Sequence, residues 1–369
     1  MQGKIIRIEI YRLDIPLKAP VTIAIGTITE ARNILVKIIT EEGTYGLGEG
    51  APFWMIVGET QDSCLATARD FARLLIGKYV WDIEGNLRIL DQYLTRNYTC
   101  KSAFDMALYD AAAKCANIPL YQFLGGSKKT ITTDETIYIG TPEAMAEDAL
   151  AIQGRGAEAI KVKLGKVPDE DIRRIQAIRE AIGAGLPLRV DANQGWDYVS
   201  AVRVLKAIEK YDVQYCEQPV KHWDFENLAR VRANSPIPIC ADESLFTHID
   251  ALQLIRQQAV DYFNIKLSKS GGIHTALKIN AIAEASGVPC MIGCMSESRL
   301  GITANAHLAS ARANIVFYDL DSPFEHALDP VVGGATYRDH YHLDLPDAPG
   351  HGADMDEDYL KEMEKIVVE

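Results

Sequence analysis

Eight short β-type segments alternate with helical segments between about residues 133 and 323, and no other feature of the 369-residue sequence constrains the fold as strongly. Neighbouring segments start about 25 to 30 residues apart. Regular β–α alternation of this kind predicts a closed barrel of the TIM type. The alternative, an open doubly wound sheet, would require a Gly-rich nucleotide turn after the first strand, and "GTPEAM" is not one. The segments are "TDETIYIG", "EAIKVKLG", "PLRVDAN", "VQYCEQP", "IPICADES", "YFNIKLSKSGG", "CMIGCMSES" and "IVFYDLDSP".

The first third of the chain has a different pattern. The runs "KIIRIEIYRLDI" and "ARNILVKIIT", followed by the turn-like "EEGTYG", predict antiparallel strands of a meander. Two helical patterns follow, "TQDSCLATARDFARLLIG" and "CKSAFDMALYDAAAKCANIPLYQFLGG". We therefore expect an α+β unit of roughly 125 residues before the barrel.

Composition excludes several classes of partner. The net charge is -13, and no Lys/Arg cluster forms a basic stripe, so a nucleic-acid partner is not expected. No apolar run approaches the ~18 residues of a membrane span, and "MQGKIIRIEIYRL" alternates instead of forming the apolar part of a signal peptide. A cytoplasmic protein is expected. The seven cysteines lack paired CxxC spacing, which predicts reduced core thiols.

Ionisable residues close the predicted strands in a consistent phase. Active sites of such barrels lie at the C-terminal face, where the strand ends meet. An acid or a base closes seven of the eight segments, which is improbable for unrelated surface charges, although an interior ion-pair network is a structural alternative. These residues are Lys161 and Lys163, then Asp191, Glu217, Asp242, Lys266, Glu297, and Asp319 with Asp321.

Three of the carboxylates predict a metal site. Asp191, Glu217 and Asp242 follow one another at intervals of 26 and 25 residues, one per successive βα unit. Three oxygen donors without Cys or His favour a hard cation, and Mg²⁺ fits because it keeps open positions for water or substrate. Asn193 could support the first ligand. The alternative is a metal-free set of salt bridges to the barrel lysines.

The lysines suggest proton transfer. Lys161 and Lys163 are two apart on a strand and share one face, whereas Lys266 approaches the metal from the opposite side of the barrel. A substrate carboxylate held between them would present its α-carbon to a base on each face. Metal and Lys161 would stabilise the enediolate, and neighbouring cations would lower the pKa of a lysine base. Removal of a proton on one side and return on the other inverts the centre.

These motifs resemble the enolase superfamily, in its muconate lactonizing enzyme subgroup. The resemblance covers nearly the whole chain and rests on "KVK", "DAN", "EQP", "ADES" and "NIKLSKSGG", with the "GEGAP" loop before them. It implies a (β/α)7β barrel at residues 126–329, with an α+β capping domain at 1–125 that the C-terminal segment, about 330–369, completes. It also implies one Mg²⁺ on the three carboxylates and acid/base work by Lys163 and Lys266.

Within this subgroup the sequence is most similar to dipeptide epimerases, which are isomerases. Asp319 and Asp321 in "FYDLDSP" share a strand face and can accept hydrogen bonds from one ammonium group. A dipeptide carries that cation, whereas the substrates of cycloisomerases, o-succinylbenzoate synthases and N-acylamino acid racemases, the alternative activities, do not. The alternative for the pair itself is a loop cap or a partner for a nearby Arg. A non-catalytic binding protein is a further alternative, but none of the matched positions is lost.

The resemblance also identifies substrate-contacting positions. Thr136 on the first strand and Ser296 and Ser298 on the seventh match such positions. Glu297 lies between the two serines and is expected to support the substrate-contacting residues without contacting the substrate itself. Related enzymes that epimerise Ala-Glu tend to carry an arginine in the loop at residues 21–31, where Gly26 stands here. With Trp54 in the second loop, residues 50–60, a neutral or hydrophobic C-terminal residue is slightly favoured over Glu, although simple packing between cap and barrel is an equal alternative for these loop residues. A homo-oligomer is compatible with the sequence.

Overall fold

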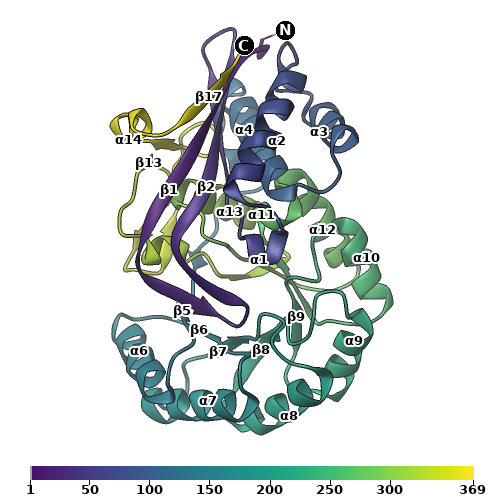
Figure 1. Cartoon of the computed structure of the whole chain (residues 1–369), viewed down its shortest axis with the longest axis vertical. Helices are drawn as coiled ribbons and strands as arrows, with labels where there is room; N and C mark the ends of the chain where they lie inside the picture. Colours follow the sequence, from purple (N-terminus) through teal and green to yellow (C-terminus); the bar gives the residue numbers. More distant parts are fainter. Residues whose placement is uncertain (1) are drawn as a thin grey trace.

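The computed structural model describes residues 2–369, which form a sheet-and-helix cap above a ring of strands and helices (Figure 1). Two long strands and a shorter one make an antiparallel meander in the cap: β1 (Ile5–Ile23), β2 (Gly26–Thr40) and β3 (Tyr45–Gly50). The last strand of the chain, β17 (Lys365–Val368), pairs with β1, so the C-terminus returns to the cap. The predicted meander and α+β unit are confirmed.

Helices α2 (Gln61–Leu75) and α4 (Tyr98–Cys115) of the cap pack against this meander. The other cap helices are α1 (Trp54–Val57), α3 (Ile83–Tyr93) and α5 (Leu120–Phe123). Helix α4 is buried at 15 of its 18 positions and lies directly against β3. A Cβ at Gly48 would lie 2.0 Å from the Ala103 carbonyl oxygen, so glycine in β3 is what allows the two backbones to approach so closely.

One expectation for the cap differs from the structure. Residues 21–31, expected as a loop, form the tip of the β1–β2 hairpin, with Ile23 opposite Gly26. The reason is local: Val21, Thr22 and Ile23 face a β-branched run that includes Thr27 and Ile28, and such residues favour extended backbone. In Figure 1 this hairpin descends from the cap to the ring of strands.

All eight predicted barrel strands are present and pair in parallel in chain order. Strands β5 and β12 meet through a hydrogen bond from the Asp134 N–H to the Tyr318 carbonyl oxygen, 3.2 Å, which brings the two ends of the sheet together. Tyr215, Cys240 and Met291 fill the interior below the strand ends. The strands are β5 (Glu135–Ile137), β6 (Ile160–Lys163), β7 (Leu188–Asp191), β8 (Val213–Glu217), β9 (Ile239–Ala241), β10 (Tyr262–Ile265), β11 (Cys290–Ile292) and β12 (Ile315–Tyr318).

Helices surround these strands, as the alternating pattern predicts. Their apolar stripes face the sheet, and most begin at a side-chain cap such as Thr141 or Asp197. They are α6 (Pro142–Gly154), α7 (Pro168–Ile182), α8 (Tyr198–Ile208), α9 (Phe225–Asn234), α10 (His248–Arg256), α11 (Leu267–Ser270), α12 (Ile273–Ala285) and α13 (Arg299–Ala311), with 3₁₀ turns at Glu209–Tyr211 and Ser322–Glu325.

The C-terminal segment runs back along the barrel to the cap. It contains β13 (Val331–Gly333), β14 (Thr336–Arg338), β15 (His342–Asp344), β16 (Ala353–Met355) and α14 (Glu357–Lys361), and β15 also pairs with the short strand β4 (Ile131–Thr132). The boundaries predicted for the two domains stay a prediction.

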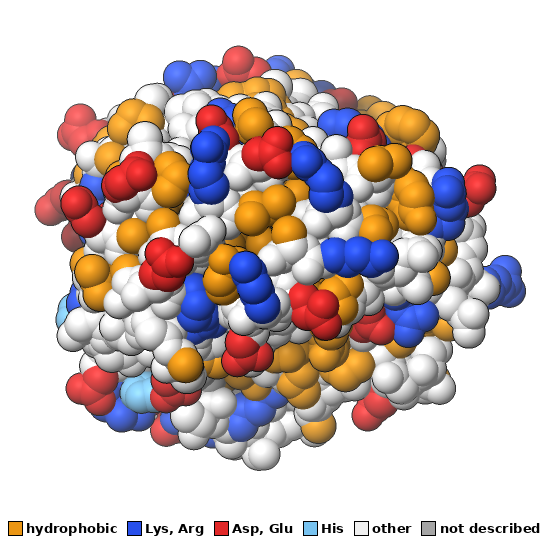
Figure 2. Space-filling view, turned by 90° about the horizontal axis from the view of Figure 1, so that it is seen from below, with side chains coloured by type: hydrophobic (Ala, Val, Ile, Leu, Met, Phe, Trp, Pro, Cys, Tyr) orange, Lys and Arg blue, Asp and Glu red, His pale blue; other side chains and the backbone are white. Residues whose placement is uncertain are grey.

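The surface and the cysteines agree with the compositional expectations. On the face shown in Figure 2, acidic and basic side chains are interspersed. Within residues 2–369, no helix combines the length and the apolar character needed to cross a membrane. All seven cysteines are free thiols, and six of them are buried, as the sequence predicts.

Candidate active site

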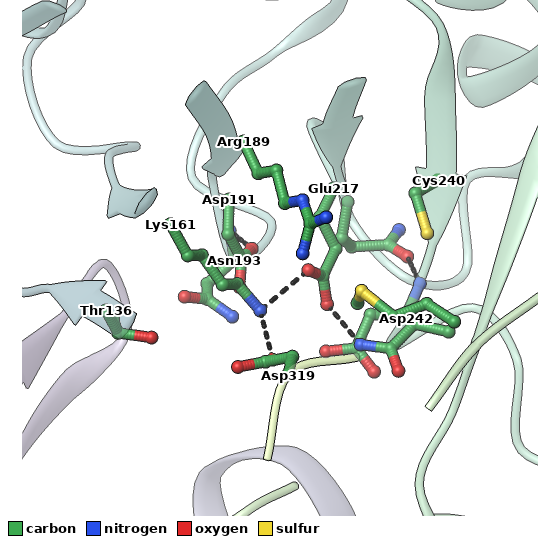
Figure 3. A network of polar contacts seen from close by, with 12 residues as sticks. Thr136, Lys161, Arg189, Asp191, Asn193, Glu217, Cys240, Asp242 and Asp319 are labelled. Carbon is green, nitrogen blue, oxygen red and sulfur yellow. Dashed lines mark hydrogen bonds and ion pairs between the residues drawn. The ribbon is translucent and has the colours of Figure 1, made fainter. Parts of the chain in front are cut away.

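Strand ends of the barrel bring acidic and basic side chains to one level. Lys163 at the end of β6 is in register with Asp191 at the end of β7, which is in register with Glu217 at the end of β8. Asp242 follows β9 and Lys266 follows β10. Because the strands are parallel, these C-terminal ends share one mouth of the barrel. Figure 3 shows Asp191, Glu217 and Asp242 converging there with Lys161 and Asp319.

Asp191, Glu217 and Asp242 form a buried carboxylate cluster. All three are fully buried, and one oxygen of each lies within 4.8 Å of the others. Burial and the neighbouring Asp191 raise the pKa of Glu217 to about 7, which shows how unfavourable three adjacent negative charges are. A cluster made only of carboxylate oxygens suits a hard divalent cation, so these residues fit Mg²⁺.

Each carboxylate of the cluster also contacts a lysine. The Lys163 ammonium lies 2.7 Å from Asp191, and the Lys266 ammonium lies 2.8 Å from Asp242. The ion pairs expected under the metal-free alternative are therefore present, and they involve the same carboxylates that would bind a cation. Ion pairing and metal binding are consequently coupled at this site.

Lys161 is the most strongly held of the three lysines. Its ammonium lies 2.6 Å from Asp319, 2.8 Å from Glu217 and 3.5 Å from Asp191 (Figure 3). Burial lowers the pKa of Lys161, but Asp319, Glu217 and Asp191 together raise it well above its usual range. Lys161 is therefore a fixed positive charge, which suits the stabilisation of a substrate carboxylate.

The expected lowering of a lysine pKa by neighbouring cations does not describe Lys266. Burial lowers the pKa of Lys266, and Lys161 does so weakly, but Asp242 and Glu217 raise it above its usual value. The prediction considered only the neighbouring cations, but the Asp242 carboxylate lies 2.8 Å from the Lys266 ammonium. A divalent cation on those carboxylates would offset part of the field that raises this pKa.

A cavity at the barrel mouth combines polar and apolar walls. Lys163 and Lys266 both line it, together with Asp319, Asp321 and Thr136. Most of the rest of its wall is apolar and comes from the β1–β2 hairpin, the segment after β3 and the loop after β11: Leu17, Val21, Ile23, Ile28, Phe53, Ile56 and Met295. Polar side chains also line it: Asn193, Ser296, Ser322 and Glu325. One side of the cavity can therefore bind charge, and the other can accept a side chain without charge.

The two aspartates after β12 differ in their surroundings. Asp319 Oδ2 accepts a hydrogen bond from Lys161 at 2.6 Å, whereas Asp321 Oδ2 accepts one from the Thr136 backbone N–H at 2.8 Å. Burial raises the pKa of both, but Lys161 brings that of Asp319 to about 2. Burial and the Asp319 charge raise the pKa of Asp321 well above its usual value. A cation bound between them would favour ionised Asp321.

Several predicted substrate contacts lie outside the cavity. The hydroxyl of Ser298 donates to Glu49 at 2.7 Å and caps α13, while Ser296 does line the cavity. Trp54 is 43% exposed and stacks on Phe53, which reaches the cavity in its place. Substrate contacts by Ser298 and Trp54 stay predictions.

Gly26 is in the hairpin tip near the cavity. A Cβ there would lie 2.1 Å from the Met55 sulfur, so Met55 occupies the space that a longer side chain at this position would need. An apolar thioether therefore fills the space beside Gly26 at the hairpin tip.

The predicted supporting residues lie beside the charged groups. The Asn193 backbone N–H donates to Asp191 at 2.9 Å, and its side-chain amide donates to Glu243 at 3.1 Å. Glu297 is 1% exposed and accepts a hydrogen bond from Ser268 at 2.9 Å.

Sequence reasoning missed two charged residues of the site. Lys269 donates to the Asp242 carboxylate at 2.6 Å, and its spacing three residues after Lys266 could have indicated it. Arg189, in register with Lys161 on the neighbouring strand, forms a buried ion pair with Asp134 at 2.8 Å. Arg189 precedes Asp191 by two residues and so shares its inward face, which strand alternation could have revealed.

Comparisons with known proteins agree with this geometry. The family model "Mandelate racemase / muconate lactonizing enzyme, N-terminal domain" matches residues 5–125, and "Enolase C-terminal domain-like" matches residues 144–359.

Two curated relatives cover nearly the whole chain. A D-Ala-D/L-Ala epimerase of Cytophaga hutchinsonii is 44% identical over 99% of this chain and 99% of its own length. An L-Ala-D/L-Glu epimerase of Clostridium acetobutylicum is 41% identical over 94% of this chain and 97% of its own.

Among solved structures, the dipeptide epimerase from Cytophaga hutchinsonii, complexed with Mg and the dipeptide D-Ala-L-Val, superimposes with a TM-score of 0.98. It is 43% identical in sequence, and the match covers 99% of this chain and 100% of that one.

Proposed function

The chain belongs to the mandelate racemase/muconate lactonizing enzyme family of the enolase superfamily, and we propose that it is a Mg²⁺-dependent dipeptide epimerase that inverts the α-carbon of the C-terminal residue. One observation carries the proposal: a single cavity contains Lys163, Lys266 and the Asp319–Asp321 pair, next to the carboxylate cluster. These groups match the α-carbon, the ammonium and the carboxylate of a dipeptide.

Asp191, Glu217 and Asp242 would hold the Mg²⁺. When bound, the cation neutralises part of the cluster's charge and stabilises negative charge on the substrate carboxylate. The Lys161 ammonium, fixed by its carboxylate contacts, donates to the same carboxylate and strengthens that interaction as the enediolate forms.

Proton transfer then requires one lysine on each face of the α-carbon. Lys163, as the neutral amine, takes the α-proton from one face, and Lys266, as the ammonium, returns a proton to the other. The reverse reaction exchanges these roles, so the resting enzyme needs one neutral and one charged lysine. The different contacts of the two, Asp191 for Lys163 and Asp242 for Lys266, support separate roles.

The Asp319–Asp321 pair distinguishes this reaction from the other activities of the subgroup. We propose that the substrate ammonium lies between Asp319 and Asp321 and donates to both. The substrates of a cycloisomerase, an o-succinylbenzoate synthase or an N-acylamino acid racemase lack this cation and would leave two buried carboxylates without it.

The wall of the cavity favours a neutral or hydrophobic C-terminal residue. The two relatives named above act on Ala-Ala and Ala-Glu, so overall identity does not choose the side chain. The apolar residues Val21, Ile28, Phe53 and Ile56 line the cavity, and Met55 fills the space at Gly26 where an arginine would pair with Glu. Ala-Glu is the second candidate substrate. Cytoplasmic location and homo-oligomeric assembly complete the proposal.

The test is an L,L-dipeptide library in deuterated water, followed by mass spectrometry with and without EDTA. We expect uptake of one deuterium at the C-terminal α-carbon, strongest for neutral and apolar residues and lost with EDTA. Absence of uptake across the library would overturn the epimerase proposal and favour a lyase, a cycloisomerase or a binding protein. Uptake that survives chelation would overturn the metal requirement alone.

A further inference from the structure

Two buried carboxylates of the cap act on helices of the barrel. Glu49 at the end of β3 reaches the first turn of α13, and Asp105 of α4 accepts hydrogen bonds from the first N–H groups of α12, from Ile273 at 2.6 Å and His274 at 3.0 Å. The N-cap residue of helix α12 is Gly272, which has no side chain to accept these hydrogen bonds, so a carboxylate of the cap domain accepts them instead.

Glu49 makes the more extensive of the two connections. Its Oε1 accepts hydrogen bonds from the Ser298 N–H at 2.8 Å and from the Asn33 amide at 2.7 Å. Its Oε2 accepts hydrogen bonds from the Ser298 hydroxyl at 2.7 Å and from the Gly301 N–H at 3.0 Å. Glu49 and Ser298 are fully buried, so all four bonds form away from water.

Two parts of the cap, strand β2 and the residue after β3, contact two successive loops of the barrel. Asn33 also donates to the Ser296 carbonyl oxygen at 2.8 Å, and Ser296 lines the substrate cavity. The Ala51 N–H donates to the Ser268 hydroxyl at 3.2 Å, and that hydroxyl donates to Glu297 at 2.9 Å. Ser268 lies two residues after Lys266, so these contacts connect the loop after β11 with the loop that follows the proposed base.

We propose that Glu49 is a positioning residue through which the cap fixes the loop 294–298 and thereby sets the selectivity for the substrate side chain. This inference rests on the proposed function for its kinetic consequence only. Cys294, Met295 and Ser296 of that loop line the cavity, and the loop is connected to the cap through Ser296 and Ser298. A shift of the loop therefore changes the wall that meets the side chain, while the carboxylate cluster keeps its place.

The variant Glu49→Gln isolates this role. The amide keeps the size of the carboxylate but has one accepting oxygen for four donors. In one orientation the amide oxygen faces the Ser298 N–H and the Asn33 amide, and the NH₂ group faces the Gly301 N–H, which is also a donor. In the opposite orientation the NH₂ group faces the Ser298 N–H and the Asn33 amide, which are both donors. At least one buried donor is unpaired in either case.

Glu59 provides a matched control. It is 6% exposed, and it accepts hydrogen bonds from the N–H groups of Thr99 and Cys100, at 2.9 and 3.1 Å, in the first turns of α4. These contacts lie wholly within the cap. Glu59→Gln thus removes a comparable buried carboxylate and destabilises the cap without changing its connection to the barrel.

The experiment compares both variants with the wild-type enzyme in two measurements. The first is the ratio of kcat/KM for Ala-Val over Ala-Ala, with KM and kcat separated. We expect Glu49→Gln to change this ratio by about 5-fold or more, mainly through KM, while Glu59→Gln keeps it. The second is hydrogen–deuterium exchange of the peptide spanning residues 294–302, which should lose about 10-fold in protection in Glu49→Gln only.

An unchanged ratio in Glu49→Gln, or an equal change in both variants, would overturn the positioning role. The exchange measurement needs no substrate, so unchanged protection of residues 294–302 in Glu49→Gln would also overturn it. Failure of the proposed function would instead be seen as a wild-type enzyme that exchanges no dipeptide α-proton.

Discussion

Replacement of Asp321 by Asn tests whether the Asp319–Asp321 pair binds a substrate ammonium. The asparagine keeps a carbonyl oxygen for the Thr136 N–H, which lies 2.8 Å from the carboxylate, so the loop after β12 should hold its position. The change removes the negative charge. Asp319 is already paired with Lys161 at 2.6 Å, so Asp321 is the acid of the pair that is free to balance a new cation.

The expected magnitude follows from these contacts. A hydrogen bond to a charged group contributes about 1.5–3 kcal/mol, which corresponds to roughly 10- to 150-fold in kcat/KM. Because burial and Asp319 raise the pKa of Asp321, part of that energy is used to ionise the acid when the ammonium binds, so we expect a loss near the lower limit, about 10-fold.

The assay is α-proton exchange followed by NMR, with Ala-Val and its N-acetylated form as paired substrates. The loss should appear for the free amine alone, because the acetylated form carries no cation, and a thermal melt should show that the variant is folded. An unchanged kcat/KM for Ala-Val, or an equal loss for both substrates, would refute an ammonium site at Asp321.

Three further predictions concern stability and selectivity. Burial lowers the pKa of His307 to about 3, so the unfolded chain binds a proton below about pH 6.5 that the folded protein does not. The free energy of unfolding therefore decreases as the pH is lowered. Urea unfolding should show a loss of about 1.4 kcal/mol from this group between pH 7.5 and pH 5.5. If the variant His307→Gln had the same pH slope as the wild type, this prediction would be contradicted. Gly48→Ala should reduce the free energy of unfolding by about 1–3 kcal/mol through overpacking, whereas Gly154→Ala, whose Cβ meets nothing within 4 Å, should not; equal effects in urea would refute the close approach at β3. Gly26→Arg combined with Met55→Ala should raise the ratio of kcat/KM for Ala-Glu over Ala-Val by about 10-fold, and an unchanged ratio would show that the hairpin tip does not select the side chain.

The barrel could be predicted because each strand is a local pattern. An apolar run closed by an ionisable residue defines a strand end, and parallel strands bring such ends together without any further information. Asp191, Glu217 and Asp242 therefore met as expected. Arg189 follows the same alternation but was overlooked. A single sequence does not show that this arginine is buried, so it could not be distinguished from an ordinary polar residue.

Contacts between distant segments could not be predicted in this way. Ser298 was expected at the substrate, but its hydroxyl donates to Glu49, 249 residues earlier in the chain. No periodicity relates these two positions, because the contact depends on how the cap sheet docks on the barrel. The tip at Gly26 was likewise expected as a loop, since the hairpin is defined by pairing across the turn and by Met55 from another segment.

Exchange by the single variants Lys163→Ala and Lys266→Ala tests the central claim, transfer of a proton between opposite faces of one α-carbon. Each epimer of the dipeptide is incubated separately in deuterated water with each variant, and α-deuterium is measured before any inversion. The two-base mechanism predicts that each variant keeps exchange with one epimer and loses it with the other, in opposite senses for the two lysines. Equal loss with both epimers in either variant would contradict the assignment of one lysine to each face.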